Sequence, residues 1–352
     1  MAVFDARSFN HHEMVAFRDD PKTGLQAIIA IHDTTLGPAV GGCRMYPYSN
    51  TDQALEDVLR LSRGMTYKSA LAGLPMGGGK SVIIGNPAVQ KNRDLLLAMG
   101  EFVESLSGKY VAAEDSGTTV ADVKVIGERT THVSGVLDGQ EHGGDPSPYT
   151  AYGTYCGILA AVKYRLGRDS VEGLRISLQG AGAVGRHLTR RLIEDGAKVF
   201  VADINPDNLK KVEALGAEIV NVDEIFQLSV DVFAPCAMGA VINDRTVDVI
   251  DAKIIAGAAN NQLATPAEGE RLIQRGILYA PDFVINAGGI IDVHYQRVDG
   301  NSGRSNAHVE QIAGTLTRIF ERSDELGVST ESVAENLAEE IIEAAKEKHK
   351  AA

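Results

Sequence analysis

Residues 64–85 read GMTYKSALAGLPMGGGKSVIIG and carry two lysines, Lys68 and Lys80. Glycines and a proline between the lysines break any regular helix, so the chain must turn back between them. The apolar residues 81–84 predict a strand with Lys80 at its mouth, and we expect both amines to converge on one cleft. Desolvation and a neighbouring positive charge both disfavour an ammonium ion, so such a pair can provide a base near neutral pH.

The glycine triplet at 77–79, followed by Lys80, has two other interpretations. The end of a phosphate-binding P-loop is excluded, because that motif needs a glycine where this chain has Leu74 and a helix where this chain has a strand. The triplet can also be a tight turn that lets two backbone segments approach, with no role in a site. The rest of the chain must decide between a turn and a site.

The composition predicts about two domains, with 352 residues of which 44% are hydrophobic and 23% charged. A net charge of -13 argues against a nucleic-acid partner, which needs clustered Lys and Arg. Cys43, Cys156 and Cys236 lack metal-type spacing, so we expect no metal and a reducing compartment. No apolar signal core or membrane-length run occurs. We therefore expect a cytoplasmic protein without a membrane partner.

Around the quoted stretch the chain alternates strands and helices. Residues 25–32 predict a buried strand, and the glycine-rich residues 36–45 predict a loop that a ligand can approach closely. An amphipathic helix starting at Asn50 or Thr51 leads to Lys68. A helix with apolar residues between 95 and 106 and a strand at 110–113 follow.

That strand ends on Asp115, a carboxylate at a point well suited to a cleft. The alternative is an N-cap for the next helix.

The turn-rich residues 138–148 predict the approach to a domain boundary. Beyond it, a helix at 151–164 and a strand at 175–179 precede GAGAVG at 180–185. This glycine pattern is weak alone, but here it joins a strand to a helix, as dinucleotide binding requires.

Gly180 would permit the tight turn, Gly182 the approach of a pyrophosphate to the helix N-terminus, and Gly185 close packing of helix on strand. A second strand at 199–202 ends at Asp203, which can accept hydrogen bonds from ribose hydroxyls and repel a 2'-phosphate. This favours NAD over NADP. The alternative is a fold that has lost its cofactor.

Four more strands are predicted at α/β spacing, at 230–234, 253–256, 277–279 and 283–285. Polar or glycine-bearing loops follow them, where open α/β sheets bind ligands. Asparagines in these loops can hold an amide or a carboxylate, or can merely close turns; they are Asn260, Asn261 and Asn286. An amphipathic helix ends the chain, and we expect it to fold back on the first domain.

Six motifs occur in a fixed order: PAVGG at 38–42, GGGK at 77–80, EDSGT at 114–118, GAGAVG at 180–185, ANNQ at 259–262 and VINAGG at 284–289. Together they resemble the glutamate, leucine, phenylalanine and valine dehydrogenase family, and most closely its leucine dehydrogenase branch. The resemblance implies an α/β fold of two domains with an active-site cleft between them. Residues 1–140 with a C-terminal helix at about 328–352 would form the catalytic, substrate-binding and oligomerisation domain, and 141–327 a doubly wound Rossmann domain for NAD.

The resemblance also implies an activity and roles for individual residues. The reaction would be the reversible oxidative deamination of an L-amino acid to a 2-oxo acid, ammonium and NADH. Lys80 would be the general base that activates water, and Asp115 would exchange protons with the substrate nitrogen. The substrate carboxylate would be held by Lys68, Asn261 and the backbone of Gly41 and Gly42. The cofactor would contact Gly180, Gly182, Ala183, Val184, Gly185, Asp203, Cys236, Ala237, Asn260 and Asn286.

Substrate choice rests on the position of Val40, where the glutamate branch has a lysine that holds a side-chain carboxylate. An apolar substrate of the leucine, valine or isoleucine kind is therefore expected. By the same resemblance, the pocket would be lined by Val40, Met65, Ala113, Ile290 and Val293. Two of these are small, so an aromatic substrate such as phenylalanine or tryptophan is the alternative. A non-catalytic dinucleotide sensor is the alternative of a different class. A homo-oligomer, a dimer or an octamer, is expected.

Overall fold

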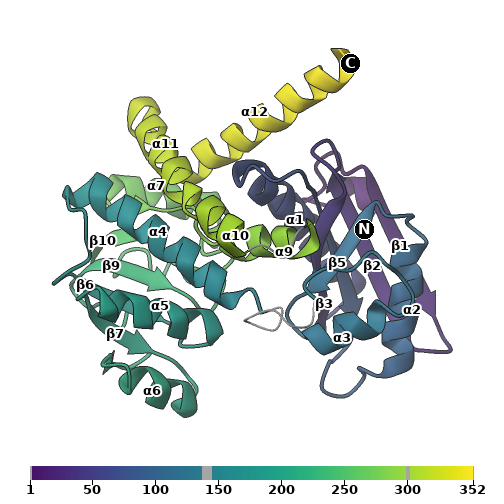
Figure 1. Ribbon diagram of the computed structural model, residues 1–352, viewed down its shortest axis with the longest axis horizontal. Helices are drawn as coiled ribbons and strands as arrows, with labels where there is room; N and C mark the ends of the chain where they lie inside the picture. The colour runs from purple at the N-terminus through teal and green to yellow at the C-terminus, as the bar shows by residue number, and fades with distance from the viewer. Residues whose placement is uncertain (1, 137–144, 299–301, 352) are drawn as a thin grey trace. The chain divides into compact units, whose positions relative to one another are not determined.

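The computed structural model describes residues 2–136, 145–298 and 302–351, which divide into two compact units (Figure 1). The first unit comprises Met1–Asp145, Gln296–Gly300 and Ala338–Ala352, and the second comprises Pro146–Tyr295 and Asn301–Leu337. The predicted boundary after residue 140 lies outside the described residues. Within these residues, no helix combines the length and apolar character needed to cross a lipid bilayer.

The first unit is built on a five-stranded sheet in the order β1-β2-β4-β3-β5. β1 and β2 are antiparallel, as are β2 and β4, whereas β4 and β5 both run parallel to β3. The strands are β1 (Met14–Asp20), β2 (Leu25–Asp33), β3 (Ala39–Tyr46), β4 (Gly77–Ile84) and β5 (Tyr110–Glu114); the helices are η1 (Val3–Asp5), α1 (Thr51–Leu71), α2 (Arg93–Glu104) and α3 (Val120–Ile126).

Helices cover both faces of this sheet, because successive side chains of a strand point to opposite sides. Ile28 and Val82 pack with Leu55 and Leu59 of α1. Their neighbours Ile29 and Ile83 pack on the other face with Met99 and other residues of α2. We call the side of the sheet covered by α1 the α1 face. Each strand thus has an α1-facing set and an α2-facing set of residues.

Two predictions for the first unit are wrong. The glycine-rich residues 36–45 do not form a loop, because β3 lies between β4 and β5 and its backbone bonds to both. The triplet at 77–79 is not a turn either, since it begins β4, and the chain reverses at residues 72–76. Sequence reasoning also missed β1, an edge strand whose side chains are largely exposed or half-buried.

The second unit contains a six-stranded sheet in the order β11-β10-β9-β6-β7-β8, and every neighbouring pair is parallel. Counted along the chain, this is the strand order 3-2-1-4-5-6 of doubly wound dinucleotide-binding folds. The strands are β6 (Arg175–Gln179), β7 (Lys198–Ala202), β8 (Glu218–Ile219), β9 (Val230–Pro235), β10 (Ala252–Ile255) and β11 (Leu278–Tyr279). The prediction of a two-domain α/β fold with a Rossmann-type sheet is confirmed.

Helices alternate with these strands and continue after them. They are α4 (Ser147–Leu166), α5 (Ala183–Glu194), α6 (Pro206–Glu213), α7 (Pro266–Gln274), α8 (Asp282–Ile285), α9 (Gly288–Val298), α10 (Ser302–Val309), α11 (Gln311–Leu326) and α12 (Thr330–Ala351). The strand predicted at 283–285 is wrong, because these residues form α8. A short apolar run fits a buried helical turn as well as a strand, so its period alone cannot separate the two.

The last part of α12 packs in the first unit. The hydroxyl of Tyr67 on α1 donates a hydrogen bond to Glu339 Oε1 at 2.7 Å, and Lys346 Nζ lies 3.4 Å from Asp33 Oδ2. These contacts hold the chain terminus against α1 and the end of β2.

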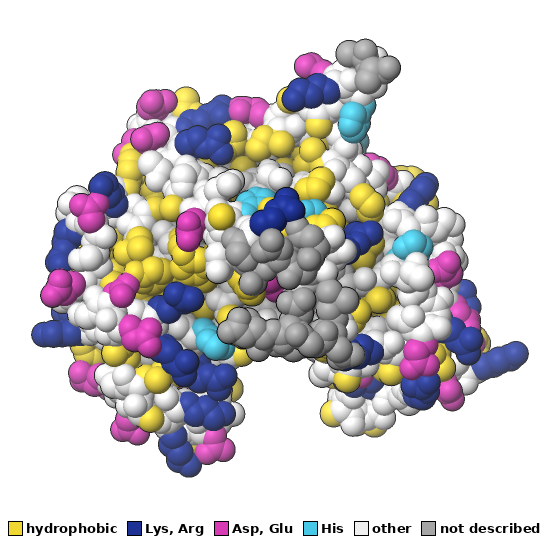
Figure 2. All heavy atoms as spheres, viewed as in Figure 1, with side chains coloured by type: hydrophobic (Ala, Val, Ile, Leu, Met, Phe, Trp, Pro, Cys, Tyr) yellow, Lys and Arg dark blue, Asp and Glu magenta, His cyan; other side chains and the backbone are white. Residues whose placement is uncertain are grey.

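An apolar groove lies between α4 and α11 in the second unit, where Figure 2 shows exposed hydrophobic side chains. Its volume is about 580 Å³, and Tyr152 and Tyr155 are among its lining residues. Arg191 stacks on the Tyr152 ring and Tyr155 bonds to Asp195, both at the C-terminal end of α5. The glycine-rich loop lies at the other end of α5, about 18 Å away for twelve residues at 1.5 Å each, so the groove is separate from that loop.

The close approach of α1 to β4 depends on the missing side chain of Gly78. A Cβ at Gly78 would lie 2.0 Å from the backbone nitrogen of Thr66 on α1. We therefore expect Gly78→Ala to push α1 away and to lower the free energy of unfolding by about 1 to 3 kcal/mol, as overpacking does. Urea unfolding followed by circular dichroism measures this.

Gly64→Ala is the matched control, because the added methyl group would contact nothing within 4 Å on the same helix. Removing a helical glycine there is expected to raise stability by up to about 1 kcal/mol. Equal urea midpoints for the two variants would show that the contact at Gly78 is not tight.

Candidate active site

The predicted site residues of the first unit gather on the α1 face of its sheet. On each strand these positions alternate with residues that pack on the α2 side, so they are on the face that α1 covers. These residues are Val40 and Gly42 on β3, Lys80 on β4, and Ala113 and Asp115 on or just after β5. Met65 and Lys68 come from α1 itself, which covers this face. One layer of the fold therefore brings most of the predicted set together.

Lys80 and Asp115 form an ion pair between Nζ and Oδ2. The Lys80 side chain is 8% exposed and the Asp115 side chain 16%, so the pair is largely shielded from water. Asp115 Oδ1 also accepts a hydrogen bond of 2.7 Å from the backbone N–H of Ser116. Burial alone would raise the pKa of the Asp115 carboxyl, but the positive charges of Lys80 and Arg44 outweigh burial and lower that pKa to about 2.

The turn that carries Asp115 is fixed against β3. Thr118 Oγ1 donates to the carbonyl of Cys43 at 2.7 Å and accepts from the N–H of Asp115 at 3.0 Å. A Cβ at Gly42 would lie 2.6 Å from Asp115 Cβ, so Gly42 leaves the space that the Asp115 side chain fills. The N-cap of the following helix is Thr119. Asp115 is therefore not an N-cap, and its carboxylate remains available to the α1 face.

The backbone of Gly41 and Gly42 is held from the opposite side of the sheet by Tyr110. The buried Tyr110 hydroxyl donates to the carbonyl of Gly41 at 2.7 Å and lies 3.0 Å from Ser81 Oγ. The same hydroxyl lies 3.3 Å from the carbonyl oxygen of Gly42. Because both carbonyls are bound, the peptide groups of the glycine pair are fixed in orientation. Sequence reasoning missed this role of Tyr110, although a tyrosine inside an apolar strand needs a partner for its hydroxyl.

Lys68 lies in the last turn of α1 and is half-buried. The contact of Gly78 with Thr66 puts this turn directly on β4, and Val40 pairs with Gly78 in the sheet. Met65 and Lys68 are the half-buried neighbours of Thr66 on this turn of α1. The expected convergence of the two lysine-bearing segments is produced by α1 packing on β4, and not by the glycine triplet acting as a turn.

Arg44 is a residue of the α1 face that sequence reasoning did not assign. Its Nε lies 3.4 Å from Asp115 Oδ2, and its Nη1 lies 2.9 Å from Asp57 Oδ2 on α1. The available signal was a cation two residues after the glycine pair, in a segment that the prediction treated as a loop. Recognising the segment as a strand would have directed Arg44 to the same face as Gly42.

In the second unit the glycine-rich loop joins β6 to α5. Gly180 has a φ of +99°, and a Cβ at Gly185 would lie 1.9 Å from the Gly180 carbonyl oxygen. These two glycines therefore permit the turn and the close packing that the sequence predicted. Gly182 caps α5 without a side-chain hydrogen bond, and a Cβ there would meet nothing within 4 Å. Ala183 and Val184 form the first turn of α5, whose N–H groups have no partner within the helix.

Asp203 follows β7 and turns towards this loop. Its Oδ2 accepts a hydrogen bond from the N–H of Ala181 at 2.6 Å, and its Oδ1 accepts from the N–H of Asn205 at 2.7 Å. Each carboxylate oxygen has a second lone pair. The side chain is thus held at the edge of the glycine-rich loop with acceptor capacity left.

The loops after β9 and β10 meet the same edge of the sheet. Ala237 contacts Gly180, since a Cβ at Gly180 would lie 2.6 Å from Ala237 Cβ, and the N–H of the preceding Cys236 donates to the carbonyl of Gln179 at 2.7 Å. Asn286 Nδ2 donates to Asn260 Oδ1 at 2.7 Å.

Asn286 is 5% exposed, and its Oδ1 is buried without a hydrogen-bond partner in the described part of the chain. Such an acceptor fits an amide N–H₂ donor. Asn261 has a φ of +53° and its carbonyl accepts from Ala240, so this backbone is also part of a turn.

Ile290 and Val293 lie on α9, which packs against α4. A Cβ at Gly288 would lie 2.0 Å from the carbonyl oxygen of Tyr149, so the start of α9 touches α4 directly. Ile290 is half-buried, and Val293 is 9% exposed. Both side chains belong to the second unit with Asn261.

Comparison with known proteins decides the family. Residues 11–132 match the family model described as Glu/Leu/Phe/Val dehydrogenase, dimerisation domain, and residues 201–352 match Glutamate/Leucine/Phenylalanine/Valine dehydrogenase. The leucine dehydrogenase of Bacillus subtilis (strain 168) is 48% identical over 97% of this chain and 94% of its own length. The chain belongs to the Glu/Leu/Phe/Val dehydrogenase family.

Aromatic branches of this family are similar to the chain to nearly the same degree. The L-tryptophan dehydrogenase of Nostoc punctiforme is 44% identical over 98% of both chains, and its crystal structure matches with a TM-score of 0.83 over 96% of this chain and 97% of that one. The phenylalanine dehydrogenase of Bacillus thermotolerans is 43% identical over 95% of this chain and 89% of its own length. The prediction of an NAD-dependent amino-acid dehydrogenase is confirmed at the level of the family.

The residues of the second unit fit NAD. The uncapped start of α5 offers N–H groups to a pyrophosphate, the space beside Gly182 admits it, and Asn286 Oδ1 offers an acceptor to a carboxamide. Asp203 adds an acceptor at the edge of the loop where an adenosine ribose would lie.

The low pKa of Asp115 predicts how stability responds to acid. The folded value of about 2 lies below the ordinary value of 3.8, so the charged carboxylate stabilises the fold above about pH 4. This contribution, of the order of 2 kcal/mol, is lost as the pH falls from about 4 towards 2. We expect wild type and Asp115→Asn to differ most in urea midpoint at pH 7, and the difference to shrink as the pH is lowered from about 4 towards 2.

Asp169→Asn serves as the control for this measurement, because Asp169 forms an exposed pair with Lys163. Its urea midpoint should run parallel to that of wild type across the whole range. A constant gap between wild type and Asp115→Asn would mean that the carboxylate does not titrate with the fold.

Proposed function

We propose that this chain catalyses the NAD-dependent, reversible oxidative deamination of an apolar L-amino acid of the leucine, valine or isoleucine kind. An amino acid, NAD and water give the 2-oxo acid, ammonium and NADH. The single observation that carries the proposal is the buried Lys80–Asp115 ion pair on the α1 face. A base and a proton-exchanging carboxylate in contact are what deamination needs, because water must lose a proton and the nitrogen must exchange protons.

The proposed roles follow from the chemistry of each side chain. Lys68 pairs its ammonium with the substrate carboxylate, with help from the Gly41 and Gly42 backbone and from Asn261. Lys80 removes a proton from the water that attacks the imine carbon of the substrate, and Asp115 carries protons to and from the substrate nitrogen. The short path between Nζ and Oδ2 supports proton exchange within the pair.

NAD supplies the hydride acceptor when it is bound. We propose that Gly180, Gly182, Ala183, Val184 and Gly185 hold its pyrophosphate and that Asp203 accepts from its ribose hydroxyls. Asn260, Asn286, Cys236 and Ala237 would hold the nicotinamide end. The buried acceptor of Asn286 and the contact of Ala237 with Gly180 support this assignment.

The substrate pocket is proposed to consist of Val40, Met65, Ala113, Ile290 and Val293. Val40 is apolar and 2% exposed, and it offers no cation to a side-chain carboxylate. The identity to leucine dehydrogenases supports a branched aliphatic substrate. An aromatic substrate is the second candidate, favoured by the small side chain of Ala113 and by the similarity to tryptophan and phenylalanine dehydrogenases.

The wider setting of the enzyme is also a proposal. We propose residues 1–140 with about 328–352 as the catalytic and oligomerisation domain and 141–327 as the NAD domain. The match of residues 11–132 to a dimerisation domain supports a homo-oligomer, a dimer or an octamer. The unpaired Cys43, Cys156 and Cys236 support a reducing, cytoplasmic setting.

The activity test follows NADH absorbance after leucine and NAD are mixed at alkaline pH. Absorbance should rise with wild type, and Lys80→Met should lower kcat by about 100-fold or more, because general base catalysis is worth about 10² to 10⁴. Lys163→Met is the control, since that lysine is 66% exposed and forms an ion pair with the exposed Asp169. Full activity in Lys80→Met would refute the assignment of the base. No NADH with any amino acid would instead favour a dinucleotide sensor.

Substrate preference is tested by kcat/KM for leucine, valine, phenylalanine, tryptophan and glutamate. We expect leucine and valine to be used with values within about 200-fold of each other, because one methylene in an apolar pocket changes kcat/KM by about 10- to 200-fold. Glutamate should fall below both, because its charged side chain would be buried without a partner. A higher kcat/KM for tryptophan or phenylalanine would select the aromatic candidate, and activity confined to glutamate would contradict the interpretation of Val40.

A further inference from the structure

Arg44 is a cation on β3 whose side chain is only 20% exposed. A buried charge must have partners to be tolerated. Arg44 has two carboxylates, Asp57 at 2.9 Å from Nη1 and Asp115 at 3.4 Å from Nε. The guanidinium therefore joins a residue of α1 to the proposed proton-exchanging carboxylate.

We propose that Arg44 is a positioning residue for Asp115, whose permanent positive charge keeps that carboxylate oriented and ionised while Lys80 exchanges its proton. The inference rests on the proposed function of Lys80 and Asp115. When Lys80 is neutral, it no longer offers a positive charge to Asp115. An arginine stays protonated under all conditions of the reaction, so Arg44 holds the carboxylate throughout.

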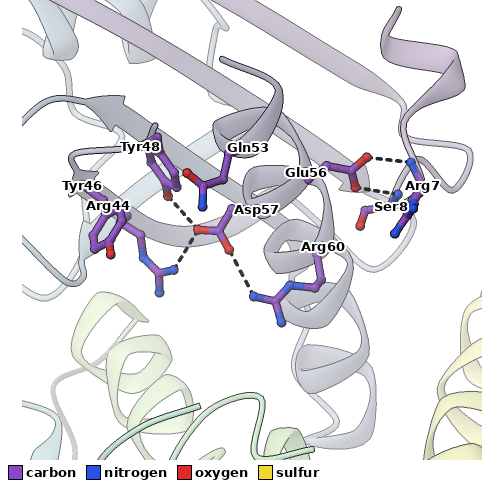
Figure 3. Close-up of a pocket in the computed structure, with 9 residues that line it drawn as sticks. All are labelled: Arg7, Ser8, Arg44, Tyr46, Tyr48, Gln53, Glu56, Asp57 and Arg60. Atoms are coloured by element: carbon purple, nitrogen blue, oxygen red, sulfur yellow. Dashed lines mark hydrogen bonds and ion pairs between the residues drawn. The ribbon is translucent and has the colours of Figure 1, made fainter. Parts of the chain in front are cut away.

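Asp57 anchors the guanidinium from the side away from Asp115. Figure 3 shows Asp57 between Arg44, Tyr48 and Arg60. The Tyr48 hydroxyl donates to Oδ2 at 2.6 Å and Arg60 Nη2 donates to Oδ1 at 3.1 Å. Both oxygens of Asp57 are thus engaged, and the anchor has one preferred position.

The contacts of Arg44 distinguish a role in positioning Asp115 from a role in neutralising Asp57 alone. Asp57 alone would neutralise Arg44 through Nη1, and this contact would satisfy a structural role. Nε is also buried and has no hydrogen-bond partner among the described residues; it lies 3.4 Å from Asp115 Oδ2, the same oxygen that pairs with Lys80, so this second contact is an ion pair. Two cations from neighbouring strands therefore act on one carboxylate oxygen, and only one of them is proposed to change its charge.

Other titratable groups near Asp115 do not replace this charge. Burial raises the pKa of the Cys43 thiol on β3 to about 11 and that of the Tyr110 phenol on β5 well above its usual range, so both stay neutral. Glu114, the last residue of β5, is an acid whose pKa burial also raises. Lys80 on β4 and Arg44 on β3 remain as the cations that lower the pKa of Asp115.

A cavity of about 760 Å³ gives solvent a route to the guanidinium. Arg44, Tyr48, Asp57 and Arg60 line it together with Arg7 and Tyr46 (Figure 3). A small cation can therefore reach the place of the Arg44 side chain when that side chain is shortened.

The test compares Arg44→Met and Arg44→Lys with wild type under the NADH assay. Arg44→Met should lower kcat by roughly tenfold or more with little change in KM, and should move the acidic limb of the pH profile of kcat to higher pH. Loss of a cation this close to a carboxylate raises its pKa by about 1 to 3 units. Arg44→Lys keeps the charge but not both contacts, so it should restore part of the activity.

Arg93→Met is the control, because Arg93 is a 59% exposed arginine of the same unit whose ion pair is with Glu128, outside the network of Asp57 and Asp115. It should leave kcat and the pH profile within about threefold of wild type. Asp57→Asn, which leaves Arg44 present but removes its anchor, should shift the profile in the same direction as Arg44→Met. Equal profiles for wild type and a folded Arg44→Met would overturn the proposal.

Chemical rescue tests the role of the guanidinium within a single variant, so differences in folding between variants do not affect the result. Methylguanidinium added to Arg44→Ala should enter the cavity and raise kcat several-fold with saturation, whereas sodium chloride at the same ionic strength should not. Absence of rescue together with an unchanged pH profile in Arg44→Ala would count against the proposed role.

Carbon-13 NMR of the Asp115 carboxyl separates this proposal from the proposed function. The pKa of Asp115 should rise in Arg44→Met by about 1 to 3 units, whether or not leucine is a substrate. If wild type had no deaminase activity but the pKa of Asp115 still rose in Arg44→Met, the proposed reaction would be refuted and the effect of Arg44 on Asp115 would stand. An active wild type without the shift would refute the role of Arg44 alone.

Discussion

The ion pair of Lys80 and Asp115 is the interaction on which the first unit depends. A lysine inside a sheet loses its hydration, and only an opposite charge in direct contact makes its burial tolerable. The carboxylate must therefore reach the middle of β4 from the end of β5, across β3. This requirement explains Gly42, whose missing side chain leaves the space that Asp115 occupies. It also explains the tight turn at Thr118, which holds Asp115 against β3.

Glycines in these strands have a cost in conformational entropy and provide no side chain to pack. The first unit accepts this cost because removing Cβ atoms brings charged and polar groups close to backbone. At Gly78 the gain is the contact of α1 with β4, which brings the last turn of α1, with Lys68, against the strand that carries Lys80. The buried Tyr110 hydroxyl then binds the carbonyl group of Gly41 and offsets part of the lost rigidity. The α1 face is consequently a fixed surface with its charges in place.

Local patterns were enough to predict much of this arrangement. The strand–glycine–helix order predicted the Rossmann-type half, because that pattern is short and contiguous. Lys80 and Asp115 could be predicted as site residues because each adjoins an apolar strand. β3 and Arg44 could not, since β3 is a strand only through its hydrogen bonds to β4 and β5, which lie far away in sequence. The strand predicted at 283–285 was wrong for a related reason. The four residues of α8 are too few to show a period that distinguishes a buried turn of helix from a strand.

The two cations at Asp115, Lys80 and Arg44, differ in their chemistry and in how firmly their side chains are held. Lys80 has a single amine on a flexible chain, and an amine can give up its proton and act as a base. Arg44 cannot lose its proton, and its planar group can contact two carboxylates at once. Accordingly the arginine has the firmer anchor, since Asp57 is itself bound by Tyr48 and Arg60. A site that must move a proton without moving its atoms needs one charge that changes and one that does not, and the α1 face contains both.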